Sequence, residues 1–151
     1  MDIKKIFNLV ISDFIKYIDG AVKHTIRLGR YEDKIAIVDS GFRLFLIDEK
    51  QFPFKLDISG DLIQADKVIP KEADYEDARY TNQLIELEKH TVVVIEGESG
   101  SAWVNIKLLK EFGKDLKFMT AKNKPEIKPV LIYRDDTLLG LVMPTRQSTN
   151  K

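Results

Sequence analysis

Short apolar runs bounded by turn residues recur along most of the chain, and many of them are rich in β-branched side chains. Runs of this kind are typical of β-strands that are buried on at least one face. Two of them are separated by Asp39-Ser40-Gly41, which predicts a hairpin with Gly41 at positive φ. The predicted strands are Lys4–Val10, Ile35–Val38, Phe42–Ile47, Phe54–Ile58, Thr91–Ile95, Ala102–Val104, Leu116–Thr120, Val130–Tyr133 and Leu138–Met143.

Two stretches follow the helical period instead. Apolar side chains from Phe14 to Ile26 recur at helical spacing, and Ser12-Asp13 can cap them, which predicts a helix from about Asp13 to Arg27. A second helix is expected at Ile106–Phe112, between a capping Asn105 and a terminating Gly113. Signals are weak from Ser59 to Asn82, where we expect a surface excursion, with a helical turn at Thr81–Glu88 as one option.

The order of elements predicts an α+β fold. A strand, a helix and further strands are followed by approximately the same series, so we expect one domain over residues 1–146 built as an internal β-α-β-β-β duplication. Both helices should pack on the same side of antiparallel sheet. Residues 147–151 are polar and are expected to form a disordered tail.

Each predicted helix carries basic residues on the side opposite its apolar face. Lysine and arginine together equal aspartate and glutamate, 24 of each in 151 residues, so a nucleic-acid contact would have to come from such a local patch. The alternative is an ordinary solvated lysine face. The residues in question are Lys16, Lys23 and Arg27 on the first helix and Lys107, Lys110 and Lys114 on the second.

The residue types that usually carry catalysis or hold metals are sparse. There is no cysteine, and His24 and His90 have no partner at metal-ligand spacing. The turn Gly97–Ser101 follows a strand but lacks the lysine and hydroxyl of a phosphate-binding loop. We therefore expect a binding protein without catalytic residues, metal or cofactor. A small enzyme that uses Glu98 or Ser99 is the alternative.

The C-terminal stretch Leu139–Arg146 predicts an apolar strand that Pro144 ends, with Arg146 at its rim. Such an edge is suited to docking a peptide, and the alternative is a final core strand. No stretch approaches the roughly 20 apolar residues that span a bilayer, and the N-terminus shows no long apolar leader. We therefore expect a cytoplasmic protein that does not bind membranes.

Three stretches of the chain resemble the bacterial sliding clamp, the β subunit of the replicative polymerase. Ile35–Leu44 is similar to the family's aliphatic-Ala-Thr-Asp-Gly-x-Arg-Leu hairpin, although Asp39-Ser40 replaces Thr-Asp. Val104–Phe112 resembles the segment that begins the last clamp helix. Lys128–Ile132 and Val142–Arg146 resemble the family's Ser-Pro-Val-x-Ile and its terminal Val-Met-Pro-Met-Arg-Leu. The order agrees over roughly Phe14 to Arg146, while Ser59–Asn82 has no clear counterpart.

The resemblance implies a DNA-clamp-like domain that acts as a processivity factor in DNA replication. The family's chain holds three such domains and this one has the length of one, so a ring would need several copies, and we expect a homo-oligomer of six. A single-domain clamp suits a phage or mobile element. The basic helices would face double-stranded DNA without reading its sequence, and an apolar groove would bind a DNA polymerase or another replication protein. The groove positions would be Gly41, Arg43, Leu44, Leu141, Val142, Met143, Pro144 and Arg146. The alternative within the same fold is an adaptor or inhibitor that forms no ring and binds replication proteins.

Overall fold

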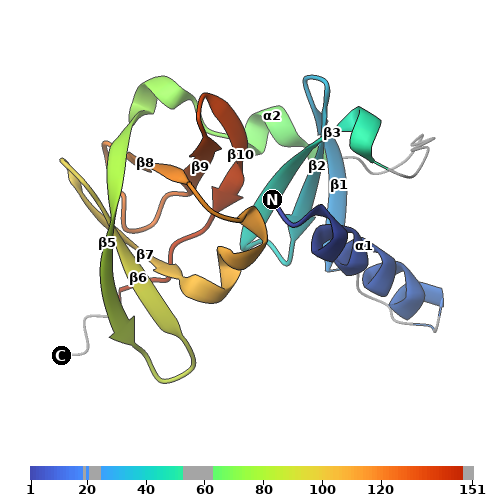
Figure 1. Ribbon diagram of the computed structural model, residues 1–151, viewed down its shortest axis with the longest axis horizontal. Coiled ribbons are helices and arrows are strands. Elements are labelled where there is room, and N and C mark those ends of the chain that lie inside the picture. Colours follow the sequence, from blue (N-terminus) through green and yellow to red (C-terminus); the bar gives the residue numbers. More distant parts are fainter. Residues whose placement is uncertain (19, 21–24, 53–62, 148–151) are drawn as a thin grey trace.

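The structure is a computed structural model that describes residues 1–18, 20, 25–52 and 63–147. Ten strands form one mostly antiparallel sheet in the order β4-β1-β2-β3-β10-β9-β8-β5-β6-β7 (Figure 1). The strands are β1 Ile26–Tyr31, β2 Lys34–Asp39, β3 Arg43–Asp48, β4 Ile63–Gln64, β5 Tyr75–Glu86, β6 Thr91–Gly97, β7 Gly100–Asn105, β8 Lys117–Ala121, β9 Val130–Arg134 and β10 Thr137–Val142. The helices are α1 Ile3–Ile18 and α2 Ala65–Val68, with 3-10 turns η1 Glu49–Gln51, η2 Glu72–Asp74, η3 Ile106–Leu108 and η4 Lys110–Phe112. The α+β class is confirmed.

Two antiparallel three-stranded units meet at the centre of the sheet. The unit β1-β2-β3 follows α1, the unit β8-β9-β10 follows the η3–η4 segment, and the last strand of one unit pairs with the last strand of the other. The six central strands are therefore arranged symmetrically about the β3–β10 pair. The two helical segments also lie together, since the amide of Asp2 donates to the carbonyl of Glu111 at 2.6 Å.

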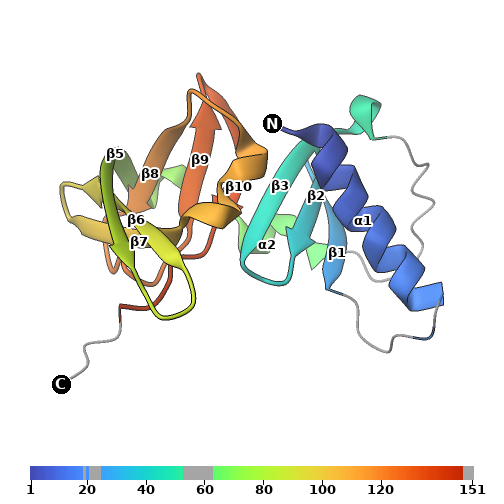
Figure 2. The same ribbon diagram turned by 60° about the horizontal axis from the view of Figure 1, so that its bottom comes forward.

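Side chains alternate along the central strands, so both faces of the sheet are buried. Along β3, Phe45 and Ile47 join the core cluster that contains Ile6 of α1 and Phe112 of η4, whereas Leu44 packs into the cluster on the opposite face. Helix α1 lies across the β1-β2-β3 unit on the first face (Figure 2). The short α2 covers part of the second face, where Ala65 is fully buried.

The first helix begins and ends about ten residues earlier than the sequence predicts. Lys4–Val10, predicted as a strand, belongs to α1, because Asp2 rather than Asp13 provides the N-cap: its Oδ1 accepts from the amide of Lys5 at 3.2 Å. Asp13 lies within α1 and is buried, and it accepts hydrogen bonds from the amide and hydroxyl of Thr25 at 2.9 and 3.0 Å. The helix ends before Gly20, whose φ of 92° does not continue it.

The second predicted helix is a pair of 3-10 turns rather than an α-helix. Its expected boundaries are confirmed: the Asn105 side chain accepts from the amide of Lys107 at 3.0 Å, and Gly113 ends the segment at a φ of 91°. Because the segment is so short, its apolar side chains Leu109 and Phe112 are held by the sheet rather than by a long helical ladder.

Most predicted strands are confirmed within one or two residues. The hairpin turn has positive φ at Ser40 and Gly41, as a type I′ turn requires. The helical turn considered at Thr81–Glu88 is wrong, because most of this stretch belongs to the long β5, where Leu84 pairs with Val93. The predicted strand at residues 54–58 lies outside the described residues, as does all of the predicted tail except Gln147.

Candidate functional site

The two groups of residues predicted to form a peptide groove lie side by side within one chain. Strand β3 of the hairpin pairs with β10, in a register that places Leu44 opposite Leu141 and Arg43 opposite Val142. Beyond the strand, the amide of Met143 donates to the carbonyl of Phe42 at 2.7 Å. The sequence could not tell whether the two groups meet within one subunit, and the strand register shows that they do.

Three of the predicted groove residues are nevertheless core residues. Leu44 and Leu141 are 1% and 4% exposed, and Val142 is fully buried. Leu44 and Leu141 face one side of the sheet and Val142 the other, so their side chains do not share a surface. The side chains of these three residues therefore do not line an open groove, because a core cluster packs on each face of β10.

Arg43, also predicted as a groove residue, is engaged inside the molecule. Its Nε donates to Asp39 at 2.8 Å, and its Nη1 donates to Glu111 at 2.6 Å and to the carbonyl of Leu108 at 3.3 Å. The guanidinium carbon lies 5.0 Å from the ring centroid of Phe45. Since the residue is only 7% exposed, Arg43 joins the hairpin to the η3–η4 segment and offers no free donor face at the surface.

A smaller apolar edge remains accessible at this place. Phe42 is 59% exposed at the tip of the hairpin, Met143 and Pro144 are half-buried beside it, and Gly41 and Arg146 are exposed. Sequence analysis missed Phe42. The apolar run predicted Phe42 as the first residue of a buried strand, so no signal marked it as exposed. We call Phe42, Met143 and Pro144 the hairpin edge.

Those predicted basic residues that the structure describes are exposed but do not form two helical faces. Lys16 lies on α1, whereas Arg27 lies on β1, because the helix ends before Gly20. Lys23 lies outside the described residues. The other three follow one another along the η3–η4 segment and just beyond it, and each is exposed: Lys107, Lys110 and Lys114.

Two of the residues considered for catalysis or metal binding, Ser99 and His90, make hydrogen-bond contacts within the fold. Gly97–Gly100 is the tight turn between β6 and β7, and the amide of Ser99 donates to Glu76 at 2.6 Å. His90 Nε2 lies 3.1 Å from the hydroxyl of Thr145, and His24 lies outside the described residues. Within the described part of the chain, no three His, Cys, Asp or Glu side chains are grouped so that they could hold a metal ion. No helix there is long and apolar enough to cross a membrane.

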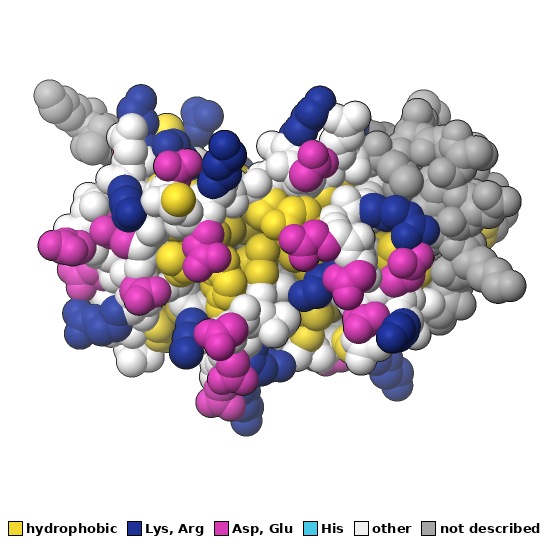
Figure 3. Space-filling view, turned by 90° about the horizontal axis from the view of Figure 1, so that it is seen from above, with side chains coloured by type: hydrophobic (Ala, Val, Ile, Leu, Met, Phe, Trp, Pro, Cys, Tyr) yellow, Lys and Arg dark blue, Asp and Glu magenta, His cyan; other side chains and the backbone are white. Residues whose placement is uncertain are grey.

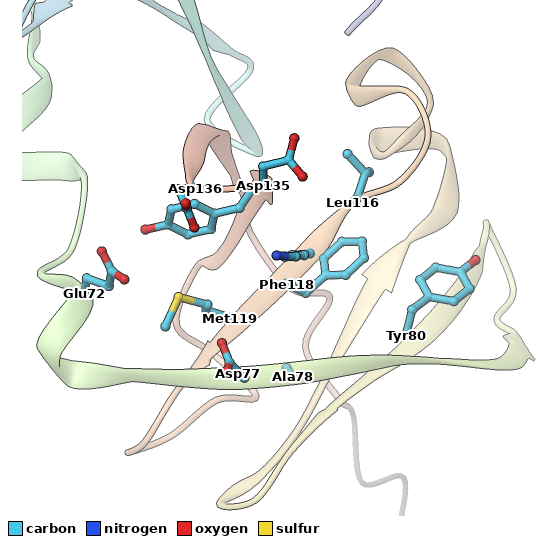
Figure 4. A pocket seen from close by; sticks show the side chains of 11 residues that line it. Glu72, Asp77, Ala78, Tyr80, Leu116, Phe118, Met119, Asp135 and Asp136 are labelled. Atoms are coloured by element: carbon cyan, nitrogen blue, oxygen red, sulfur yellow. The ribbon is translucent and has the colours of Figure 1, made fainter.

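An acidic and aromatic cleft lies between β5 and β8, where the sequence predicted no site. Its volume is about 540 Å³, and the side chains that line it include Asp77, Tyr80, Phe118, Asp135 and Asp136 (Figure 4). Figure 3 shows one face of the molecule, on which hydrophobic side chains are exposed in a central hollow among acidic and basic ones. The name β5–β8 cleft is used below for the cleft lined by Asp77, Tyr80, Phe118, Asp135 and Asp136.

Two tyrosines near this cleft hold their protons more strongly than usual. Burial, together with the charge of Glu72 and a hydrogen bond to it, raises the pKa of Tyr133 to about 12. Burial and the charge of Asp74 raise the pKa of Tyr75 to about 12. Both phenols are therefore neutral at physiological pH, and Tyr133 presents a hydrogen-bond donor to the acidic side of the cleft.

Comparison of the chain with protein-family models, with curated proteins and with solved structures gave no match. The resemblance to sliding clamps therefore stays a prediction that depends on the short motifs quoted above.

Proposed function

We propose that this chain is a clamp-like accessory protein of DNA replication that has no enzymatic activity. In this proposal it assembles as a homo-oligomer around double-stranded DNA and tethers a polymerase or another replication protein. The observation that carries the proposal is the meeting of two three-stranded units, each preceded by a helical segment, at the pair β3–β10. A duplicated clamp domain is expected to have such a two-fold arrangement.

The ends of the sheet support assembly by edge-to-edge pairing. In the described chain β6 is the only strand that pairs with β7, although the amide of Thr145 donates to the carbonyl of Trp103 in β7 at 2.7 Å and so covers part of this edge. Strand β1 is covered on its outer side by β4 at only Gly29 and Arg30. Unpaired backbone groups at an edge strand can accept a strand from another molecule. A contact between two different edges is heterologous, and copies joined in that way close into a ring when the rotation allows it.

The basic residues support a contact with DNA from the side of the helical segments. Lys107, Lys110 and Lys114 are exposed along or just beyond η3–η4, the segment that packs beside the start of α1. Lysines of this kind would contact phosphate oxygens, so binding would be independent of base sequence and would weaken with salt.

Replacement of lysines by glutamates beside η3–η4, with a matched replacement beside α2 on the opposite face of the sheet, tests this contact. The variant pair Lys107→Glu and Lys110→Glu should weaken association with duplex DNA by tenfold or more at low salt and should reduce its salt dependence. Lys67→Glu and Lys71→Glu, at exposed positions on or beside α2, provide the matched control. Equal losses in the two pairs would contradict a specific DNA-facing side. Light scattering at several concentrations measures ring formation, and six protomers are expected.

A second candidate, the adaptor or inhibitor that forms no ring, is favoured by one observation on α1. Ile11, Phe14 and Ile15 are 41%, 61% and 51% exposed, and their spacing places them on one face of the helix. An exposed apolar stripe favours a protein contact over a phosphate contact. In this case the protein should be a monomer or dimer in solution. Phe14→Asp should then abolish capture of a replication protein, while the lysine reversals should leave it unchanged.

A further inference from the structure

The strands β5 and β8 pair at one end and separate at the other. They are hydrogen-bonded from Tyr75 opposite Ala121 to Ala78 opposite Phe118, after which β5 continues to Glu86 beside β6 alone. Within the described chain, the side of β5 that faces β8 therefore has no partner strand from Arg79 onward. Backbone N–H and C=O groups along such an edge can pair with an added strand.

The β5–β8 cleft opens beside this edge and continues into a second hollow of about 460 Å³. Both hollows share Tyr80, Leu116 and Phe118, and Ile106 and Leu109 extend the apolar lining toward η3–η4. The rings of Tyr80 and Phe118 have centroids 5.9 Å apart. Tyr80 is 38% exposed, so an apolar side chain that enters here would contact an aromatic surface already in place.

The opposite side of the cleft is strongly acidic. Four carboxylates and one lysine line it: Glu72, Asp77, Asp135 and Asp136, with Lys117. The whole chain has no net charge, so this excess is local. Figure 4 shows Asp135 and Asp136 in the turn above β9 and Asp77 on β5. An acidic rim attracts lysine and arginine and repels phosphate, which favours a protein segment over a nucleic acid.

We propose that the β5–β8 cleft binds an extended, basic segment of another protein, which adds as a strand to the open edge of β5. A large apolar side chain of the segment packs against the aromatic surface that Tyr80 and Phe118 form together. A lysine or arginine of the segment lies beside Asp135 and Asp136. Backbone pairing supplies sequence-independent affinity, while the aromatic and acidic surfaces select the side chains. The hairpin edge takes no part in this site.

Selection from a displayed library of random ten-residue peptides, with the full chain as target, tests the proposal. Enriched peptides should share a large apolar residue and a nearby lysine or arginine. The best peptide is then synthesised with a fluorescent label, and its affinity is measured by anisotropy. Methylation of alternate backbone nitrogens in that peptide should reduce its affinity at least tenfold, because it removes donors from the added strand.

Matched variants locate the site. Asp135→Asn with Asp136→Asn should weaken the peptide at least tenfold, whereas Glu32→Gln with Asp33→Asn, an exposed acidic pair in the β1–β2 turn, should not change its affinity. Tyr80→Asp should abolish measurable binding, while the equally polar change Ile127→Asp, at an exposed position outside the lining of both hollows, should preserve it.

Three results would overturn the proposal. The first is a selection that enriches no peptide, and the second is a set of enriched peptides that bind the cleft variants as tightly as the unchanged protein. The third is a lower native mass for Tyr80→Asp in light scattering, which would assign the cleft to a second copy of this chain.

Discussion

Replacement of Arg43 by methionine should destabilise the protein strongly, although sequence reasoning assigned this residue to a binding groove. The side chain of Arg43 is 8% exposed, and those of its partners Asp39 and Glu111 are each 17% exposed. Methionine fills much of the same volume but leaves two nearly buried carboxylates without a cation. Removing one partner from a buried ion pair costs about 3–5 kcal/mol. Because both carboxylates keep some contact with water, we expect about 3 kcal/mol.

Urea denaturation followed by the fluorescence of Trp103, the single tryptophan, measures this loss. With a slope of about 2 kcal/mol per M, the midpoint should fall by about 1.5 M. Adding Asp39→Asn and Glu111→Gln to the methionine variant should restore part of the stability, since the uncompensated charges are then gone. Arg43→Lys should be intermediate, because two different nitrogens of arginine reach the two carboxylates.

Arg79→Met is the matched control for this prediction. Arg79 forms an ion pair with Glu96 at 2.9 Å, but its side chain is 76% exposed, so the loss should stay below about 1 kcal/mol. If Arg43→Met cost no more than this control, the buried network would not stabilise the fold in the way described. If the variant kept its stability and lost partner capture instead, the groove role predicted from the sequence would be the better interpretation.

Three further substitutions test separate features. Gly140→Ala should cost about 2–5 kcal/mol in thermal unfolding, because a Cβ there would lie 1.9 Å from the carbonyl oxygen of Leu44 at a φ of 152°; a loss under 1 kcal/mol would contradict the close approach of β10 to β3. Asp13→Ala should cost about 1–3 kcal/mol and speed amide exchange at Thr25, which loses an acceptor for its amide and hydroxyl; unchanged exchange would show that another group holds this end of β1. Because the pKa of Tyr133 is raised to about 12, the unfolded chain loses this proton first, so the free energy of unfolding should fall as pH rises from about 10 to about 12. Tyr133→Phe should make that decline shallower in urea titrations, and an unchanged slope would refute the assignment.

The local sequence determined the elements that depend on neighbouring residues. Asp39-Ser40-Gly41 specified the hairpin turn, because Gly41 readily adopts the positive φ that a type I′ turn needs. Asn105 and Gly113 specified both ends of the η3–η4 segment through an acceptor for a free amide and a residue at positive φ. Apolar β-branched runs such as β6 predicted buried strands. The α+β class followed from the order of these elements, whereas strand β1 was not predicted, because its first residues were assigned to the helix.

Competing local signals explain the error in the first helix. Residues on both sides of Ser12-Asp13 carry apolar side chains at helical spacing, and two capping sites were available. Tertiary contact decided between them: Ile6 is fully buried in the core and Asp13 is needed inside to hold Thr25, so the helix begins at Ile3 and Asp2 is its cap.

Which residues lie together and exposed at the candidate sites depended more on tertiary structure than on sequence motifs. The sequence indicated the hairpin and the final strand as parts of a candidate site. The pairing of β3 with β10 in the sheet places them side by side. Leu44 and Val142 are buried because core clusters pack on both faces of the sheet, whereas Phe42 lies in the hairpin turn and is exposed. No sequence motif predicted the β5–β8 cleft. It exists because two strands that pair for four residues then separate, and because carboxylates distant in sequence meet where they part.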